Sequence, residues 1–205
     1  MDIVISDLSK SYGEKIVLEG FSAIIPEKKM TFIMGPSGCG KTTLINILMG
    51  LVDKDNGTIT GVPARKSAVF QEDRLCESFN AVSNVRLVCD NKVKNQEIIL
   101  NLEKIGLNDH MLKPVIELSG GMRRRVALVR AIMAGSDIIF MDEPFKGLDE
   151  KTKEKTMQYV ADNIGNKTVL IVTHDIDEAN FLGGKIIEME HSGSVTYYNY
   201  NSSID

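Results

Sequence analysis

Residues 35–42, on which the fold prediction depends most, are Gly35-Pro36-Ser37-Gly38-Cys39-Gly40-Lys41-Thr42. This stretch follows the short apolar run 30–34 and precedes the apolar segment 42–49, which ends at Gly50. The run before the stretch is too short for a helix and is typical of a strand buried on both faces. The segment after it predicts a helix, since glycine suits the left-handed end of a helix. The sequence therefore predicts a strand, a glycine-rich loop and a helix in direct succession.

This loop has the composition of a nucleoside triphosphate site. Its eight residues fit the phosphate-binding pattern G-x-x-x-x-G-K-[ST], and a preceding strand and following helix are the context that the pattern requires. Glycines let several backbone N–H groups point at phosphate oxygens, and the helix N-terminus adds about half a positive charge. Lys41 is expected to reach the outer phosphates, and Thr42 to offer its hydroxyl to Mg²⁺. The alternative is a chance glycine turn, against which the flanking elements argue.

Two adjacent acids end a second buried run. Residues 138–141 predict a strand, and Asp142, Glu143 and Pro144 follow it. At the end of such a strand, Asp142 can face the Mg²⁺ shell while Glu143 faces a water aimed at the terminal phosphate. The alternative is a pair of solvated acids, and the phosphate loop in the same chain favours the first interpretation.

A serine and two glycines open a further helix. Leu118 precedes Ser119, Gly120, Gly121 and Met122, and apolar residues then recur at helical spacing as far as Met133. This arrangement predicts a second helix N-terminus that binds an anion, here without a lysine to complete it. The alternative is a serine cap followed by a flexible glycine pair. A site that has amides but no lysine resembles half of a larger site.

Strands alternate with helices along the rest of the chain. Residues 3–5 and 16–25 predict strands on either side of a turn at 12–14, and residues 72–134 are mainly helical. Further elements are expected as a strand at 168–172, a helix from Asp149, a helix from Asp175 with Glu178 completing a capping box, and a hairpin of 185–190 with 195–200 around 191–194. This alternation predicts an α/β fold with a parallel sheet. We expect one domain, with a core of 1–71 and 135–205 and a helical insert at about 72–134.

Composition excludes several classes of protein. The 205 residues are 43% hydrophobic and 25% charged, as in an ordinary folded domain, with no expected signal peptide or membrane span. Three cysteines without a C-x-x-C spacing suit a reducing compartment. Four arginines gather on the helix after Ser119, at 123, 124, 125 and 130, but a net charge of −4 argues against a nucleic-acid partner.

Seven motifs occur in an order and spacing that resembles the ABC transporter ATPase family. They are Tyr12, the loop from Gly35 to Thr43, Gln71 in Val-Phe-Gln-Glu, Leu118 to Gly121, Ile138 to Pro144, Gly147-Leu148-Asp149 and Thr173-His174-Asp175. The resemblance covers nearly the whole chain. It implies a P-loop NTPase core with a mainly parallel sheet, an N-terminal antiparallel β subdomain and an inserted α-helical subdomain.

The resemblance also implies a role for each motif. Tyr12 would stack on the adenine, and residues 35–43 would hold the phosphates of ATP. Thr42, Gln71 and Asp142 would surround Mg²⁺. Glu143 would be the general base, with His174 holding the terminal phosphate or the attacking water. Ser119, Gly120, Gly121 and Met122 would contact ATP held by a second subunit, and Asp149 would lie at the dimer interface.

By the same resemblance, the chain would hydrolyse ATP as a nucleotide-sandwich dimer, either a homodimer or a paired ATPase subunit. It would energise an importer from the cytoplasmic face of the membrane, with permease subunits contacted through about 75–87 and with a substrate-binding protein. The residues around Gln71 and around His174 are most similar to those of ATPase subunits from importers of nitrate, sulfonate and taurine. The alternatives are a soluble ABC ATPase of cofactor assembly, DNA repair or translation, and a small-molecule kinase using the same loop.

Three positions depart from the common pattern of the family. Met122 stands where glutamine is frequent, Lys146 where a small residue is frequent, and Cys39 where serine is frequent. The backbone amides that would hold phosphate are unaffected by these changes. We therefore expect nucleotide binding to survive, with altered contacts around the interface loop at Lys146.

Overall fold

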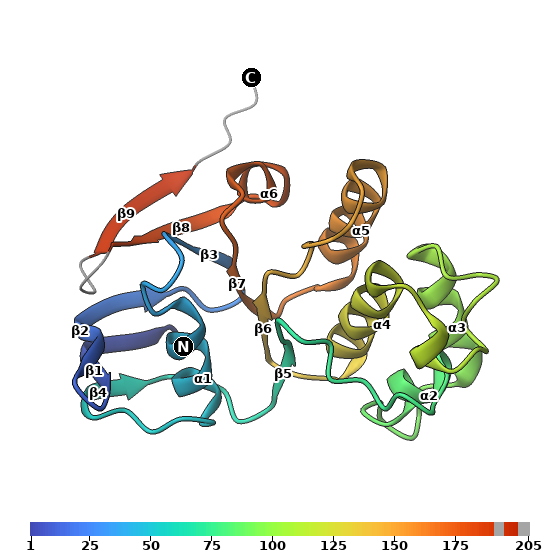
Figure 1. Cartoon of the computed structure of the whole chain (residues 1–205), viewed down its shortest axis with the longest axis horizontal. Helices are drawn as coiled ribbons and strands as arrows, with labels where there is room; N and C mark the ends of the chain where they lie inside the picture. Colours follow the sequence, from blue (N-terminus) through green and yellow to red (C-terminus); the bar gives the residue numbers. More distant parts are fainter. Residues whose placement is uncertain (191–194, 201–205) are drawn as a thin grey trace.

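A six-stranded sheet forms the centre of the molecule (Figure 1). The structure, a computed structural model, describes residues 1–190 and 195–200. In spatial order the strands are β5 (Lys66–Val69), β6 (Ile138–Asp142), β7 (Thr168–Val172), β3 (Met30–Met34), β8 (Gly184–Met189) and β9 (Val195–Tyr200). The pairs from β5 to β8 are parallel, and β9 is antiparallel to β8. The predicted mainly parallel sheet is therefore confirmed.

A second, antiparallel sheet has the order β2-β1-β4. It consists of β1 (Ile3–Tyr12), β2 (Lys15–Ile25) and β4 (Asn56–Thr60). The strand predicted at 3–5 continues to Tyr12, because shifts of register near Leu8 let the pairing with β2 resume after an interruption. At this interruption Asp7 has a φ of 51°. The N-terminal antiparallel part expected from the resemblance is thus present.

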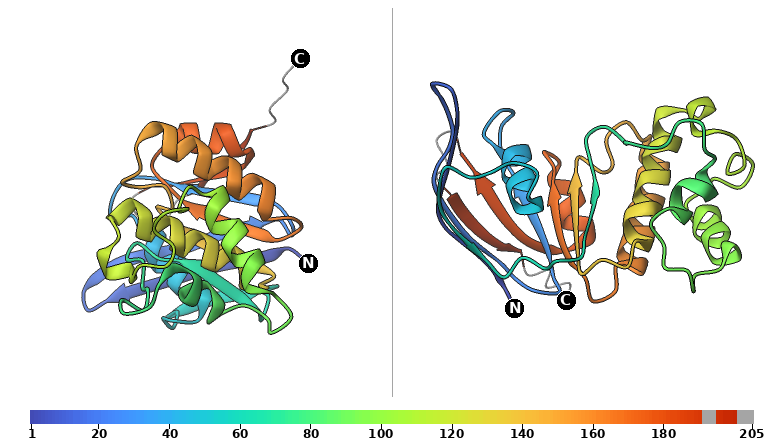
Figure 2. Two further views of the ribbon diagram at one scale, coloured as in Figure 1. Left: turned by 90° about the vertical axis from the view of Figure 1, so that its right-hand side faces the viewer. Right: turned by 90° about the horizontal axis from the view of Figure 1, so that it is seen from below.

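Helices cover both faces of the central sheet. They are α1 (Lys41–Met49), α2 (Ala81–Arg86), α3 (Asn95–Lys104), the 3-10 turn Val115–Glu117, α4 (Gly120–Met133), α5 (Glu150–Asn163) and α6 (Ile176–Leu182). On one face, α1 buries its apolar side chains in a cluster that both sheets share. On the other face, the buried apolar residues of α2 to α5 pack with Ile139 and Met141 of β6 and with Val169 and Ile171 of β7 in a second cluster. The antiparallel sheet and the helices α2, α3 and α4 consequently lie at opposite ends of the molecule (Figure 2).

Two strands of the structure, β4 and β5, are absent from the prediction. Both are short and contain few apolar residues, so neither has a marked periodicity in the sequence. They form because neighbouring strands supply partners: β4 pairs with β1, and β5 pairs with β6. These two strands therefore form because of their pairing with distant strands and not because of a local sequence pattern.

Two local expectations change at the C-terminal part of the chain. Asp175 caps α6 as expected, accepting from the backbone N–H of Asp177 at 2.9 Å, but the capping box is wrong. The Asp175 N–H donates to the hydroxyl of Thr173, while Glu178 pairs with Lys153 instead. The hairpin pairing of β8 with β9 is confirmed, whereas its expected turn at 191–194 lies outside the described residues.

No helix in the described part of the chain combines the length and the apolarity needed to cross a membrane.

Candidate nucleotide site

The phosphate loop connects the carboxyl end of β3 to the start of α1. Its backbone is left-handed at Gly35, Gly38 and Gly40, where φ is 146°, 85° and 104°. A Cβ atom at Gly40 would also lie 2.9 Å from the carbonyl oxygen of Val17, so both conformation and space require glycine there. The loop thus passes close to the end of the antiparallel sheet.

Lys41 is held over this loop. Its ammonium donates to the carbonyls of Gly35 and Pro36 at 2.7 and 2.8 Å. The same residue begins α1, whose first N–H groups have no partner within the helix. A lysine and a helix N-terminus therefore converge on one place, as binding of a phosphate chain requires.

Asp142 and Thr42 meet beside the loop. The threonine hydroxyl donates to Asp142 Oδ2 at 2.8 Å, although the two residues are 100 positions apart. Asp142 is almost fully buried, and burial raises the pKa of its carboxyl group. Thr42, Asp142 and Gln71 together line a cavity of about 460 Å³. A hydroxyl, a carboxylate and an amide oxygen at one cavity are a donor set that fits Mg²⁺, which takes oxygen ligands and usually keeps waters and phosphates besides.

Glu143 faces a different direction from Asp142. Its φ of 50° turns the chain sharply after β6, and its N–H still donates to the carbonyl of Val172 at 2.9 Å. Its Oε1 lies 2.9 Å from His174 Nδ1, at the end of the neighbouring strand β7. Carboxylate and imidazole are thus paired at the edge of the sheet that carries the phosphate loop, as a base and its orienting partner would be.

Tyr12 lies at the end of β1, half-exposed and paired with Lys15 across the hairpin. The ammonium of Lys10 lies 5.4 Å from the centre of its ring. Lys15 lines a cavity of about 240 Å³ together with Lys41, Thr42 and Thr43, whereas Tyr12 does not line it. An aromatic ring is therefore available near the phosphate loop without forming its wall.

Ser119 caps α4, accepting from the N–H of Met122 at 3.3 Å. Ser119 and Gly120 are exposed, and Met122 packs against the helical cluster. The central strands separate α4 from α1 (Figures 1 and 2). The structure therefore brings the phosphate loop, Asp142, Glu143, Gln71 and His174 together but leaves Ser119 to Met122 apart from them.

The segment before α5 contacts the helix that Ser119 opens. Asp149 is exposed and caps α5 by accepting from the N–H of Thr152 at 3.1 Å. Hydrogen bonds from the side chain and the backbone of Thr152 lower the pKa of the Asp149 carboxyl. A Cβ at Gly121 would lie 3.1 Å from Leu148 Cδ2, so Gly121 allows close contact between the two segments. Lys146 is exposed beside them.

The arginines of α4 have a structural role that the sequence analysis missed. Arg124 is buried and donates to the carbonyls of Phe70 and Gln71, and its Nε lies 3.3 Å from Asp73 Oδ1. Arg130 donates to the carbonyls of Asp73 and Arg74 at 2.9 and 2.7 Å. Burial of Asp73 raises the pKa of its carboxyl despite these cations. Helix α4 thus binds the loop that contains Gln71 through these arginines. The sequence signal for this role was the position of the arginines on the face opposite the apolar residues.

Fold and site together define a P-loop ATPase. Residues 18–146 match the sequence profile of the family described as "ABC transporter". The chain belongs to the ABC transporter family and is an ATP-binding, ATP-hydrolysing cassette.

Curated relatives and solved structures agree with this assignment. The aliphatic sulfonates import ATP-binding protein SsuB 3 of Rhodococcus jostii is 34% identical over 200 residues, which cover 93% of this chain and 72% of the relative. The taurine import ATP-binding protein TauB of Escherichia coli K12 is 35% identical over 198 residues, covering 89% and 77%.

Among solved structures, the ATP-binding cassette MJ0796 in a dimeric post-hydrolysis state with ADP and Pi has a TM-score of 0.82. It is 28% identical, with 97% of this chain and 100% of that chain covered. A second dimeric structure of the same cassette gives a TM-score of 0.81 at 29% identity and the same coverage.

Proposed function

We propose that this chain is the ATPase subunit of a membrane importer and that it works as a dimer with ATP at the interface. One observation carries the dimeric part: Lys41 and Ser119 begin helices on separate parts of the molecule, α1 and α4. A single chain therefore has two incomplete nucleotide sites. Two chains related by a two-fold axis would complete both sites, and the dimeric cassettes with similar folds support this proposal.

In the proposed site, one chain holds the nucleotide. The N–H groups of the loop and the ammonium of Lys41 would bind the phosphates, while Tyr12 would contact the base. Thr42, Gln71 and Asp142 would hold Mg²⁺, which neutralises charge on the phosphate oxygens. Binding of a cation beside Asp142 would also favour its ionised form, against the effect of burial.

Glu143 is the proposed general base. Its carboxylate would take a proton from the water that attacks the terminal phosphate, and the bond to Nδ1 of His174 orients both side chains. The partner's signature segment, Ser119 to Met122, would cover the terminal phosphate from the other side with its serine and backbone amides. Asp149 would lie at the same interface. Hydrolysis would then depend on closure of the dimer.

The helical insert, which we place at about 72–134, is the proposed contact with the permease. The segment 75–87 follows Gln71 directly and includes exposed apolar side chains, with Phe79 44% and Leu87 58% exposed. Membrane subunits can bury such side chains. Because Arg124 of α4, a helix of the insert, donates to the carbonyl of Gln71, occupancy of the nucleotide site could reach the permease through the insert.

The proposed location is the cytoplasmic face of the membrane, as a peripheral subunit. The similarity to SsuB and TauB supports an importer of sulfonate-type compounds, with a substrate-binding protein as a further component. No nucleic-acid partner is proposed.

The Glu143→Gln variant tests the proposal. The substitution keeps the size and hydrogen-bonding capacity of the side chain but removes the base. We therefore expect the variant to bind ATP without hydrolysing it and to accumulate as an ATP-bound dimer. Size-exclusion chromatography with and without ATP and Mg²⁺ measures the dimer, and phosphate release measures turnover. A variant that remains monomeric with bound ATP would contradict the sandwich dimer, and one that hydrolyses ATP normally would contradict the role of Glu143.

A further inference from the structure

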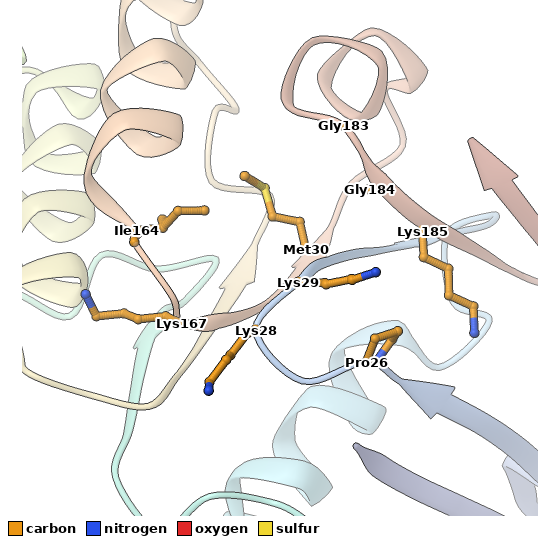
Figure 3. A pocket seen from close by; sticks show the side chains of 10 residues that line it. Pro26, Lys28, Lys29, Met30, Ile164, Lys167, Gly183, Gly184 and Lys185 are labelled. Atoms are coloured by element: carbon orange, nitrogen blue, oxygen red, sulfur yellow. The ribbon is translucent and has the colours of Figure 1, made fainter. Parts of the chain in front are cut away.

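A lysine-rich pocket lies at the edge of the central sheet opposite the phosphate loop. The phosphate loop follows the carboxyl end of β3, whereas this pocket forms where β3, β7 and β8 begin (Figure 3). Its volume is about 400 Å³, within the range of about 300–1,000 Å³ that is usual for small-molecule sites. The lining residues are Pro26, Lys28, Lys29, Met30, Ile164, Gly165, Lys167, Gly183, Gly184 and Lys185. The pocket is therefore distinct from the nucleotide site.

The charge of this pocket is unbalanced. Four of the described residues that line it are lysines, and none is an aspartate or glutamate. Within the described chain, Lys28, Lys29 and Lys167 form no ion pair, and the neighbouring Glu27 pairs instead with the amino group of Met1. Burial lowers the pKa of Lys167, with no carboxylate opposing the shift. Three lysines that form no ion pair within the described residues, beside a fourth, favour an anionic ligand.

The walls of the pocket are fixed by backbone contacts. The N–H of Lys28 donates to the hydroxyl of Thr168 at 2.9 Å, and the carbonyl of Lys29 accepts from the N–H of Val169 at 3.0 Å. These bonds join the turn before β3 to the start of β7. Gly165 and Gly183 line the pocket with no atom near the position of a Cβ, which leaves the pocket open there. Two turns far apart in sequence thus form one defined concavity.

The lining also includes an apolar part. Met30 is partly buried and Ile164 is 7% exposed, and in Figure 3 their side chains lie above those of Lys28, Lys29 and Lys167. In the same view, Lys28 and Lys29 lie between Lys167 and Lys185. The flexible four-carbon stems of Lys28, Lys29 and Lys167 allow their ammonium groups to turn toward a ligand in this space, whereas the ammonium of Lys185 donates to the carbonyl of Ile24 at 2.9 Å.

We propose that this lysine pocket binds a phosphorylated small molecule, with the phosphate among the lysines and a short apolar part against Met30. Several lysines favour a dianion over a monoanion, since each cation adds attraction to both charges. This binding is additional to the proposed ATPase function and does not depend on it.

Calorimetric titration with phenyl phosphate tests the proposal, in the presence of saturating MgADP so that the phosphate loop is filled. We expect phenyl phosphate to bind at least about tenfold more tightly than benzenesulfonate, a monoanion with the same ring. We also expect it to bind more tightly than inorganic phosphate, and to weaken as ionic strength rises. Absence of phenyl phosphate binding, or equal affinity for the sulfonate, would overturn the proposal.

Matched variants locate the binding. The double variant Lys28→Gln, Lys167→Gln should weaken phenyl phosphate binding at least about tenfold. The control, Lys151→Gln with Lys155→Gln, makes the same change of net charge on α5, beside a cavity that Glu154 and Asp162 also line. The control should bind as the unmodified protein does, and thermal melting curves verify that both variants are folded. Equal losses in both double variants would show a general charge effect and refute the pocket.

Discussion

At the scale of single residues, the backbone separates the chemistry of two adjacent acids. Asp142 is the last residue of β6 and is buried against Thr42, whereas the left-handed conformation of Glu143 directs the next side chain to His174. A non-glycine residue in this conformation costs of order 1–3 kcal/mol and persists only when its surroundings require it. The sequence predicted two different positions for these acids, but it contained no sign of the φ that produces them.

Replacing Asp142 by asparagine should stabilise the protein and abolish ATP hydrolysis. Because burial raises the pKa of Asp142, the carboxyl group binds its proton more tightly in the folded state than in the unfolded chain. The free energy of unfolding therefore falls as pH rises from the ordinary Asp pKa, about 4, through the pKa of the folded state. Asparagine removes this penalty and can still accept from Thr42. Without nucleotide, we expect the Tm at pH 7 to rise by about 2–4 °C, as for a change of ~1 kcal/mol.

Thermal melting of Asp142→Asn at two pH values checks this result. The gain at about pH 7 should shrink toward about pH 4, where the aspartate itself becomes protonated. A variant that is less stable than the parent at neutral pH would show that Asp142 contributes net stability in its ionised form.

Replacing His174 by alanine should slow turnover without preventing ATP binding. The imidazole orients Glu143 through the 2.9 Å contact, and the loop amides and Lys41 that would hold the phosphates are unchanged in the variant. We expect kcat to fall by about 10²-fold, in the lower range for loss of acid–base groups. Steady-state hydrolysis and equilibrium ATP binding separate the two effects, and an equal loss of affinity would assign His174 to binding instead.

At the scale of secondary-structure elements, the predictable parts are those with a strong local signal. The apolar runs of β3, β6 and β7 and the caps at Ser119 and Asp149 were predicted because each depends on a few adjacent residues. The strands β4 and β5 depend on partners elsewhere in the chain. The same limit applies to Arg124, whose carbonyl partners are more than 50 residues away in the sequence.

Replacing Arg124 by glutamine should loosen the contact between α4 and the Gln71 loop. The change removes two charge-assisted hydrogen bonds and leaves the Asp73 carboxyl with less compensation for its burial. We expect the free energy of unfolding to fall by about 2–3 kcal/mol. Chemical denaturation measures this loss.

Arg123→Gln is the matched control for that experiment. Arg123 lies on the same helix but reaches Asp73 only at 4.0 Å, with 39% of its side chain exposed. Its replacement should cost about 1 kcal/mol or less. Equal losses in the free energy of unfolding at the two positions would mean that the buried contacts of Arg124 stabilise the protein no more than an exposed arginine on the same helix does.

At the scale of the whole molecule, the sequence predicted one α/β unit with two incomplete sites. This prediction rested on the order of the motifs, because the order indicates which nucleotide-binding segments the chain contains. Their placement required the structure, in which α1, which begins at Lys41, and α4, which Ser119 caps, lie on different parts of the molecule.

Mixing two inactive variants should restore part of the ATPase activity. In dimers of a Lys41→Ala chain with a Ser119→Arg chain, one site receives both defects and the other receives neither. Random pairing then leaves roughly a quarter of all sites intact, so we expect activity of that order after co-refolding or co-expression.

Phosphate release from the mixture, compared with each variant alone, measures this recovery. A mixture of Lys41→Ala with Lys41→Ala,Ser119→Arg is the control, because none of its sites has an intact phosphate loop. No recovery in the test mixture, with heterodimers verified by differential tagging, would contradict the proposal that one intact site formed between two chains hydrolyses ATP.

The separation of Lys41 from Ser119 also bears on how such a protein can evolve. In a homodimer, one mutation in the gene alters both nucleotide sites at once, so neither site can change alone. Duplication of the gene would remove that constraint, since the phosphate loop of one copy and the signature of the other would then form a site with its own history. One site could lose hydrolysis and keep only binding, while the second site remained under selection for turnover.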